Sequence, residues 1–148
     1  MKEENVCIKL LNDKATLPTY GSIDAAGADL YANIDEVETI LPGETKLIKT
    51  GVAMAIPKGL VGLVFARSGL ASKKGLAPAN KVGVIDADYR GEIMVALHNH
   101  SNIPQSIDVG ERIAQIAFVP YIKGNFEVVE NLEETLRGTG GFGSTGTR

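Results

Sequence analysis

The sequence predicts an all-β fold, and two observations support this prediction. Turn-forming glycine and proline residues recur at short intervals, and the 148 residues include 17 glycines. Short apolar runs lie between these turns, and short strands separated by such turns are typical of a β-sandwich or barrel. The clearest runs span residues 45–56, 60–65, 93–98 and 113–121.

Helical structure is expected at only two places. Residues 68–75 resemble a short helix of about two turns, because Ser68 can cap its N-terminus and Gly75 can end it. Residues 130–136 could form one further turn. The rest of the chain is expected to form strands and turns.

Composition and charge favour one soluble domain over residues 1–148, long enough to bury a core. The formal net charge is -3 without a long basic run, so we expect no nucleic-acid polymer as a ligand. No apolar run approaches the roughly 20 residues that cross a membrane, and no signal-type segment follows the N-terminus. The single cysteine, Cys7, excludes a disulfide framework and a cysteine-based zinc site. A cytoplasmic protein without a membrane partner is the resulting expectation.

Two apolar runs lack the alternation of a strand with one solvated face. Residues 60–66 and 93–97 contain no polar side chain. In an antiparallel protein, a strand that is apolar on both faces needs cover on each side. In a chain of this size another subunit can supply the second cover, so we predict a homo-oligomer.

The most distinctive stretch lies between Gly83 and Gly91. It holds two carboxylates, Asp86 and Asp88, and the aromatic side chain of Tyr89. The flanking glycines predict a hairpin, because glycine reaches backbone angles that other residues avoid. Such a hairpin could hold a base and a platform for a flat ligand. The alternative is a charged surface turn.

A candidate phosphate site begins at Arg67, where a predicted strand gives way to the predicted helix. The free amides and the dipole of a helix N-terminus favour an anion. Ser68 and the Gly69 amide could donate hydrogen bonds to it, and Arg67 could neutralise it. Serine caps of ordinary helices look alike, so an ordinary cap is the alternative. Lys73 and Lys74, which follow, are expected on the solvated surface.

Two polar residues interrupt apolar runs. Asp29 lies within residues 26–32 and needs either an exposed strand edge or a specific partner. A hydrated magnesium ion is one such partner, since magnesium keeps its waters and prefers few carboxylates. Gln115 must also find hydrogen bonds, either to a ligand phosphate or to the neighbouring backbone.

Asn80 offers a donor and an acceptor that could read the edge of a base, although a turn asparagine is the alternative. His98 and His100 would share one face of a strand. No third metal ligand lies near them in sequence, so a structural or surface role is favoured for both histidines.

The end of the chain, residues 137–148, is rich in glycine and is expected to be mobile when free. A frayed terminus is the simplest interpretation. Glycine backbone amides can nevertheless wrap phosphate oxygens, hydroxyls and a guanidinium can donate to them, and an aromatic ring can stack on a base. A flexible lid for a phosphorylated aromatic ligand is therefore predicted, following a β core over residues 1–136. Its candidate residues are Arg137, Phe142, Gly143, Ser144 and Thr145.

Five segments, taken in order, resemble the five motifs of the homotrimeric deoxyuridine triphosphate nucleotidohydrolases, the dUTPases. One such motif would be weak, but five in order over nearly the whole chain are specific. The matching segments are residues 26–32, 67–71, Asn80 with 83–91, 110–115 and 137–146.

The resemblance implies a distorted jelly-roll-like β barrel that assembles as a trimer, with active sites at the subunit interfaces. It implies hydrolysis of dUTP to dUMP and pyrophosphate with Mg²⁺ bound to the triphosphate. That reaction limits uracil in DNA and supplies dUMP for thymidylate synthesis.

The resemblance also assigns roles to residues. Asp86 would activate the water that attacks the α-phosphorus, and Tyr89 would pack under the deoxyribose and exclude a 2′-hydroxyl. Asn80 and Gly83 would read uracil, and Asp29 would act near the metal through water. The residues implied to hold phosphates are Arg67, Ser68, Gly69 and Gln115 in the body, with Arg137, Gly143, Ser144 and Thr145 in the tail, while Phe142 would stack on the base.

One departure from the family pattern is Ala66, which stands where many members have proline before the arginine. Two other functions are alternatives. A related trimeric dCTP deaminase needs a different acid–base arrangement, and a non-catalytic jelly-roll module would bind nucleotide or protein without needing the base and the phosphate residues together.

Overall fold

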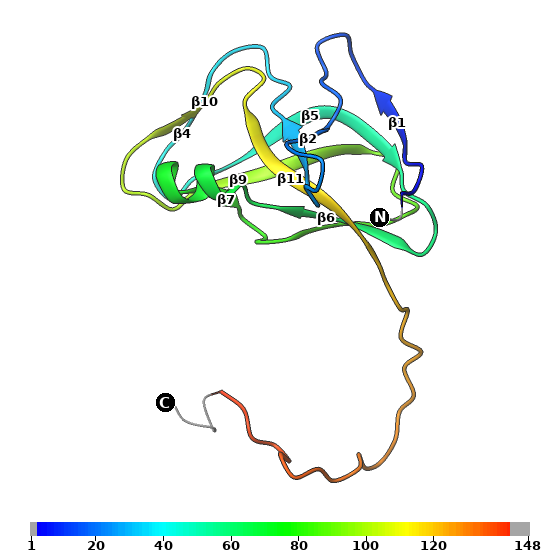
Figure 1. Ribbon diagram of the computed structural model, residues 1–148. Coiled ribbons are helices and arrows are strands. Elements are labelled where there is room, and N and C mark those ends of the chain that lie inside the picture. The colour runs from blue at the N-terminus through cyan, green and yellow to red at the C-terminus, as the bar shows by residue number, and fades with distance from the viewer. Residues whose placement is uncertain (1–2, 143–148) are drawn as a thin grey trace.

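The computed structural model describes residues 3–142, and the regular secondary structure within them is almost entirely β-strand (Figure 1). The single helical element, η1, is a five-residue π-type turn over Leu70–Lys74. The strands are β1 (Cys7–Leu10), β2 (Thr19–Tyr20), β3 (Ala28–Tyr31), β4 (Glu38–Ile40), β5 (Thr45–Ala55), β6 (Leu60–Phe65), β7 (Leu76–Pro78), β8 (Gly83–Ile85), β9 (Glu92–Asn99), β10 (Gln105–Ile107) and β11 (Arg112–Pro120).

The strands form three antiparallel sheets. Their orders are β1-β5-β9-β7, β2-β3-β11-β6-β8 and the short pair β10-β4. One apolar core draws side chains from all three sheets, including Leu30, Ile48, Ile93, Ile107 and Ile116. The expected all-β, jelly-roll-like fold is confirmed, with open rather than closed sheets.

The four long strands predicted from apolar runs are confirmed as β5, β6, β9 and β11. In β9, Ile93, Val95 and Leu97 enter the core, whereas Met94 on the opposite face is 38 % exposed. Neighbouring Leu47 of β5 is 59 % exposed. The second apolar face of this sheet therefore lacks cover within the single chain, as the absence of alternation predicted.

The helix predicted over residues 68–75 is confirmed in extent, since residues 68–69 are helical and run directly into η1, which ends at Lys74. Gly75 ends η1 in the left-handed conformation, with φ of 66°, as glycine allows without strain. The expected N-terminal cap by Ser68 is wrong. The cap position of η1 is Gly69, which has no side chain that could accept a capping hydrogen bond. The Ser68 carbonyl instead accepts a 2.7 Å hydrogen bond from Ser72 Oγ.

The helical turn expected over residues 130–136 is also wrong, since this segment contains no helix. Leu132 and Leu136 are exposed, so a helix here would have no apolar surface to pack against. Short helices without tertiary packing are marginal in water.

The hairpin predicted between Gly83 and Gly91 is wrong. Strand β8 pairs with β6 at the edge of the five-stranded sheet, whereas β9 lies between β5 and β7 in the four-stranded sheet. The chain thus crosses from one sheet to the other, and neither glycine has a positive φ. Gly91 serves a steric purpose instead, because a Cβ there would lie 2.6 Å from Cζ of Tyr89.

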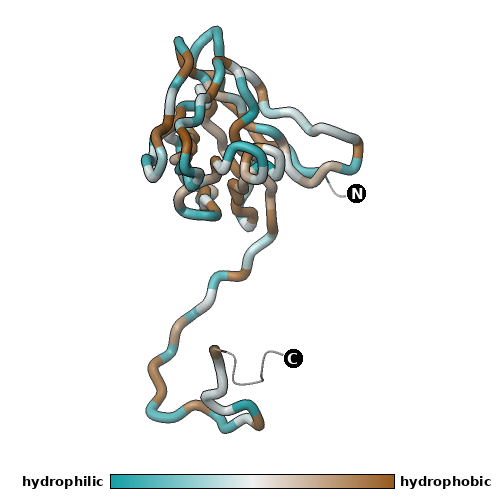
Figure 2. The backbone as a smooth tube through the Cα atoms, turned by 90° about the vertical axis from the view of Figure 1, so that its left-hand side faces the viewer, coloured by the Kyte–Doolittle hydropathy of each residue, from teal (hydrophilic) through white to brown (hydrophobic). Residues whose placement is uncertain are grey.

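The strands end at Pro120, and the chain then leaves the β body as an extended arm (Figures 1 and 2). Apolar side chains along this arm, including Ile122, Phe126 and Val128, are almost fully exposed. No described helix is long and apolar enough to cross a membrane.

Candidate active site

Two arginines share one carboxylate in the five-stranded sheet. Asp29 of β3 is only 9 % exposed. Its Oδ1 accepts a hydrogen bond from Nε of Arg67 at 2.8 Å, and its Oδ2 accepts one from Nη1 of Arg112 at 3.2 Å. Nη1 of Arg67 also donates to the Arg112 carbonyl at 3.3 Å. We call Asp29, Arg67, Arg112 and Gln115 the phosphate cluster, after the ligand that the sequence predicts for Arg67 and Gln115.

Strand pairing explains why this cluster forms. Gln115 of β11 lies opposite Asp29 on one side and Phe65 on the other. Phe65 ends β6, so Arg67 follows directly beside the other two strands. The Gln115 Nε2 group donates to the Ala66 carbonyl at 2.9 Å. Gln115 therefore has the hydrogen bond to the neighbouring backbone that was one of the two expected partners for its side chain.

The helical segment after Arg67 begins beside this cluster. Ser68 and Gly69 are exposed, and the Ala71 amide donates to the Arg67 carbonyl at 3.0 Å. Lys74 was expected on the solvated surface, and this expectation is wrong. Its Nζ donates hydrogen bonds to Glu111 Oε1 at 2.8 Å and to the Ser106 carbonyl at 2.9 Å. This ion pair ties η1 to the start of β11, the strand that carries Gln115.

A second candidate region lies where the chain crosses between the sheets. It contains a pocket of about 210 Å³. Asp86 is exposed at this pocket, and its carbonyl accepts a 3.1 Å hydrogen bond from the Tyr89 amide. The pocket is lined by Leu47, Val84, Ile85, Asp86, Tyr89, Glu92, Ile93 and Met94.

The ring of Tyr89 is fixed in this region by two features. Its hydroxyl donates to the Glu92 carbonyl at 2.9 Å. Its ring occupies the space that a side chain at position 91 would need. A flat aromatic surface thus lies beside Asp86 in a defined orientation.

Asn80 and Gly83 lie together at the beginning of β8. A Cβ at Gly83 would stand 3.6 Å from Asn80 Nδ2 and 3.2 Å from the Cβ of Val64. Arg90, for which no role is predicted from the sequence, stabilises the turn between β8 and β9. Its Nη1 donates hydrogen bonds to the carbonyls of Ala87 at 2.7 Å and Tyr89 at 3.0 Å.

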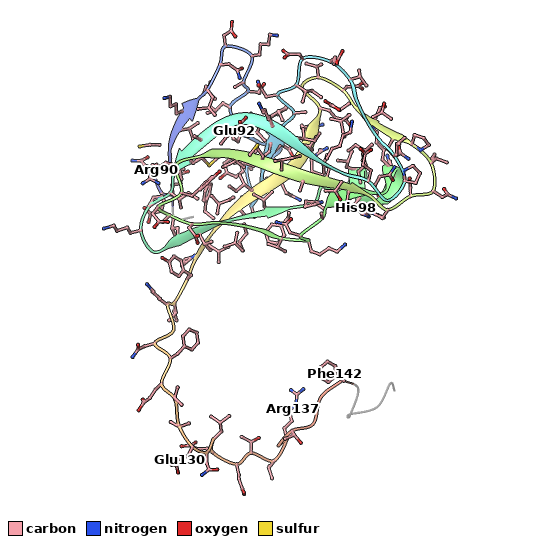
Figure 3. The ribbon with its side chains drawn as sticks, turned by 180° about the vertical axis from the view of Figure 1, so that it is seen from behind. Arg90, Glu92, His98, Glu130, Arg137 and Phe142 are labelled. Carbon is pink, nitrogen blue, oxygen red and sulfur yellow. The ribbon has the colours of Figure 1, made fainter. Side chains whose placement is uncertain are left out.

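The tail residues lie away from both regions (Figure 3). Nε of Arg137 donates to the Gly140 carbonyl at 2.9 Å, and the Phe142 ring is fully exposed. The predicted residues Gly143, Ser144 and Thr145 lie outside the described part of the chain.

His98 occupies the far end of β9 from Arg90 (Figure 3). Its Nδ1 lies 3.0 Å from the Thr45 hydroxyl on the paired strand β5. This cross-strand contact agrees with the structural role favoured for it.

A larger pocket, of about 320 Å³, lies beside the N-terminal loop and contains none of the predicted site residues. Lys14 and Asp35 form a 2.8 Å ion pair there. The hydrogen bond with Asp35 raises the pKa of Lys14, and the reciprocal bond lowers the pKa of Asp35. Both side chains are largely exposed, so solvent screens this pair.

Comparison with known proteins decides the family. The family model described as dUTPase matches residues 13–146, nearly the whole chain. This chain belongs to the dUTPase family. The expectation that it is an enzyme of this family, a dUTPase, is confirmed.

Curated relatives agree with this dUTPase assignment. A deoxyuridine 5′-triphosphate nucleotidohydrolase from Desulfitobacterium hafniense is 55 % identical over 136 residues, which cover 90 % of each chain. One from a Shewanella species is 46 % identical over 133 residues, 89 % of this chain and 88 % of that protein.

Solved dUTPase structures share the fold. The dUTPase of Staphylococcus bacteriophage 80alpha, a G164S mutant with dUpNHpp, matches with a TM-score of 0.88 and 31 % identity over 98 % of this chain and 100 % of that one. The dUTPase of phage phi11 of S. aureus matches with a TM-score of 0.80 and 27 % identity, covering 89 % and 100 %.

The described residues of this dUTPase offer no cluster of side-chain ligands for the expected magnesium ion. Among the described residues, no three His, Cys, Asp or Glu side chains gather in a way that could hold a metal ion. Both Asp29 oxygens already accept bonds from arginines. The described side chains therefore form no cluster that would hold a metal ion by themselves.

The two regions of this dUTPase lie at opposite ends of β6. Ile85 pairs with Gly62, so Asp86 follows near the start of β6, whereas Arg67 follows its end. Gly62 and Arg67 are five positions apart in the sequence, about 17 Å in an extended conformation. A single chain therefore does not bring Asp86 to the phosphate cluster.

Proposed function

We propose that this chain hydrolyses dUTP to dUMP and pyrophosphate at sites shared between the subunits of a homotrimer. The observation that carries the proposal is the phosphate cluster. Two arginines on one carboxylate, beside Gln115, favour a polyanion. The pocket beside Asp86 and Tyr89 supplies a nucleoside site with a carboxylate at its edge.

In the proposed reaction, Asp86 removes a proton from a water molecule. The water oxygen forms a bond to the α-phosphorus, and the bond from that phosphorus to the bridging oxygen of the β-phosphate breaks. Pyrophosphate leaves with the electron pair, and dUMP remains. A positioned base typically contributes about 10²–10⁴-fold, and positioning and charge neutralisation supply most of the rest.

Magnesium enters this scheme as part of the substrate, bound to the triphosphate, where it would neutralise charge that develops on the leaving group. Asp29 would lie near that ion and act through water. Its ion pairs indicate that it also orients Arg67, the arginine that receives the phosphates together with Ser68, Gly69 and Gln115.

Base and sugar recognition would fall to the crossing between the sheets. Asn80 and the backbone at Gly83 lie together and would read the edge of uracil. The fixed Tyr89 ring would pack under the deoxyribose and leave no room for a 2′-hydroxyl.

Three observations support a trimer with shared sites. Asp86 and Arg67 are separated along β6, and the outer face of β5 and β9 exposes Leu47 and Met94. The arm after Pro120 also exposes apolar side chains that its own chain does not cover. Those side chains are Tyr121, Ile122, Phe126, Val128, Val129, Leu132 and Leu136.

The tail would act as a lid from a neighbouring subunit. Residues 121–142, fully extended, could reach on the order of 70 Å, which allows the tail to cross to another site. In the proposed organisation the chain is one domain, and residues 137–148 close over the substrate. Phe142 would stack on uracil, and Arg137, Gly143, Ser144 and Thr145 would bind the outer phosphates.

The physiological role follows from the proposed reaction. Removal of dUTP limits uracil in DNA, and the dUMP product feeds thymidylate synthesis. We place this role in the cytoplasm.

The test is pyrophosphate release from dUTP, dTTP, dCTP and UTP, each with magnesium. Release from dUTP alone is expected and would support the base and sugar assignments. Ammonia release from dCTP would indicate a deaminase instead. Binding of dUTP without pyrophosphate release would indicate a non-catalytic module and would contradict the role of Asp86.

A further inference from the structure

A β-bulge changes the direction of Arg112. Side chains alternate along a strand, so Arg112, three residues before Gln115, would ordinarily face away from it. The β3–β11 register shifts between Arg112 and Ala114, which leaves Arg112 opposite Tyr31 and Gln115 opposite Asp29. Tyr31 and Asp29 share one face of β3, so the bulge turns Arg112 onto the face of the phosphate cluster. Bulges near functional sites often redirect a side chain in this way.

The geometry leaves Arg112 with unused hydrogen-bonding capacity. A guanidinium carries five N–H donors, and the described contacts of Arg112 use one of them, on Asp29. Its side chain is 49 % exposed, whereas that of Arg67 is 27 % exposed. Arg112 can therefore donate to a ligand while Asp29 holds its other edge.

The local charge also favours an anion. Two guanidinium groups share the single carboxylate of Asp29, so these three side chains carry a formal charge of about +1. If Arg112 served only to neutralise Asp29, the Arg67 ion pair would already do so. The second arginine gives the cluster an excess of positive charge.

We propose that Arg112 is a further substrate-binding residue, which donates directly to phosphate oxygens of the triphosphate while Asp29 fixes its orientation. The inference rests on the proposed function. It adds to Arg67 a second guanidinium at the phosphates, brought there by the bulge in β11.

Two variants, Arg112→Gln and Arg112→Lys, test this role. A hydrogen bond to a charged group contributes roughly 1.5–3 kcal/mol, so Arg112→Gln is expected to raise the KM for dUTP about 10- to 100-fold. Inhibition by pyrophosphate or by dUMP should weaken by a similar factor. Arg112→Lys keeps the charge but loses the planar fork, so its effect should be intermediate.

The matched control is Lys14→Gln, which also removes one positive charge from an ion pair but lies at the other pocket. Its KM should equal that of the parent. Subunit assembly and thermal unfolding of each variant are measured in parallel. Should Arg112→Gln fail to fold, the KM and inhibition constants of Arg112→Lys decide the question.

The inference is overturned if Arg112→Gln lowers the unfolding temperature but keeps the parental KM and inhibition constants, because Arg112 would then serve only the fold. A parental KM in a folded Arg112→Lys variant, where that variant decides, would also overturn it. Failure of the parent itself to release pyrophosphate from dUTP would instead contradict the proposed function.

Discussion

The phosphate cluster and the nucleoside pocket are built in opposite ways. Asp29 and Gln115 lie opposite each other on the adjacent strands β3 and β11, and Arg67 follows the end of β6. Side-chain bonds from Arg67 to Asp29 and from Gln115 to the Ala66 carbonyl hold these residues together within one chain. Asp86 and Tyr89 lie on an exposed crossing between two sheets, held by local contacts such as the bond from the Tyr89 hydroxyl to the Glu92 carbonyl.

This difference indicates that phosphate binding and nucleoside recognition depend on different parts of the structure. Charged groups that must bind a polyanion gain from a rigid, partly buried frame, where their orientation is set before the ligand arrives. The proposed base, the proposed sugar platform and the tail lie on exposed surfaces that a neighbouring subunit could complete. Changes in the phosphate cluster should therefore affect stability and activity together, and changes in the pocket or the tail should affect activity alone.

The largest effect is expected for Asp86→Asn. Loss of the proposed base should reduce kcat by about 10²–10⁴-fold, while the affinity for dUTP is largely kept and the unfolding temperature is unchanged. Single-turnover hydrolysis and dUTP binding measure the two quantities. Parental turnover by this variant would exclude Asp86 as the base.

Deletion of residues 137–148 should come next. The described arm makes no strand pairing with its own β body, so turnover should fall strongly without loss of the trimer. Steady-state kinetics and mass in solution test this together. Collapse of the assembly on deletion would mean that the tail is structural.

Phe142→Ala isolates one contribution of the tail. Stacking of an aromatic ring on a base is worth roughly 1–3 kcal/mol, so kcat/KM for dUTP should fall by about 5- to 150-fold. Phe142→Tyr keeps the ring and serves as the control. Unchanged kinetics in Phe142→Ala would reject the stacking role.

Gly91→Ala should have the smallest effect and should appear in specificity. The added Cβ would displace the Tyr89 ring, so the preference for dUTP over UTP should fall by roughly 10-fold, as expected for about 1.4 kcal/mol of lost discrimination. Tyr89→Phe keeps the ring in place and loses only the bond to Glu92. An unaltered dUTP-to-UTP ratio in Gly91→Ala would show that ring position does not set sugar choice.

The sequence predicted the parts of the fold that depend on local pattern. Apolar runs gave β5, β6, β9 and β11, and the exposed Met94 agrees with the need for cover on a second face. The hairpin expected between Gly83 and Gly91 failed because β8 pairs with β6, a partner chosen by tertiary structure rather than by the intervening turn.

The same limit explains why the contacts of Arg112 and Lys74 could not be predicted. Arg112 lies within residues 110–115, which resemble a dUTPase motif, but regular strand alternation would turn its side chain away from Gln115, and only the bulge in β11 places it on the same face. Lys74 looked like a surface lysine because its partner Glu111 is far away in sequence. Long-range register decided both cases.

The proposed function requires that Asp86 and Arg67 of one active site come from different subunits. The most direct test mixes two impaired variants, Asp86→Asn and Arg67→Gln, by co-expression or joint refolding, and measures pyrophosphate release from dUTP. Sites that receive both intact residues should form in mixed trimers, about one site in four in an equal mixture of a symmetric assembly. Activity well above that of either variant alone is the predicted result. Activity no greater than the average of the two variants, in trimers shown to be mixed, would contradict the shared site.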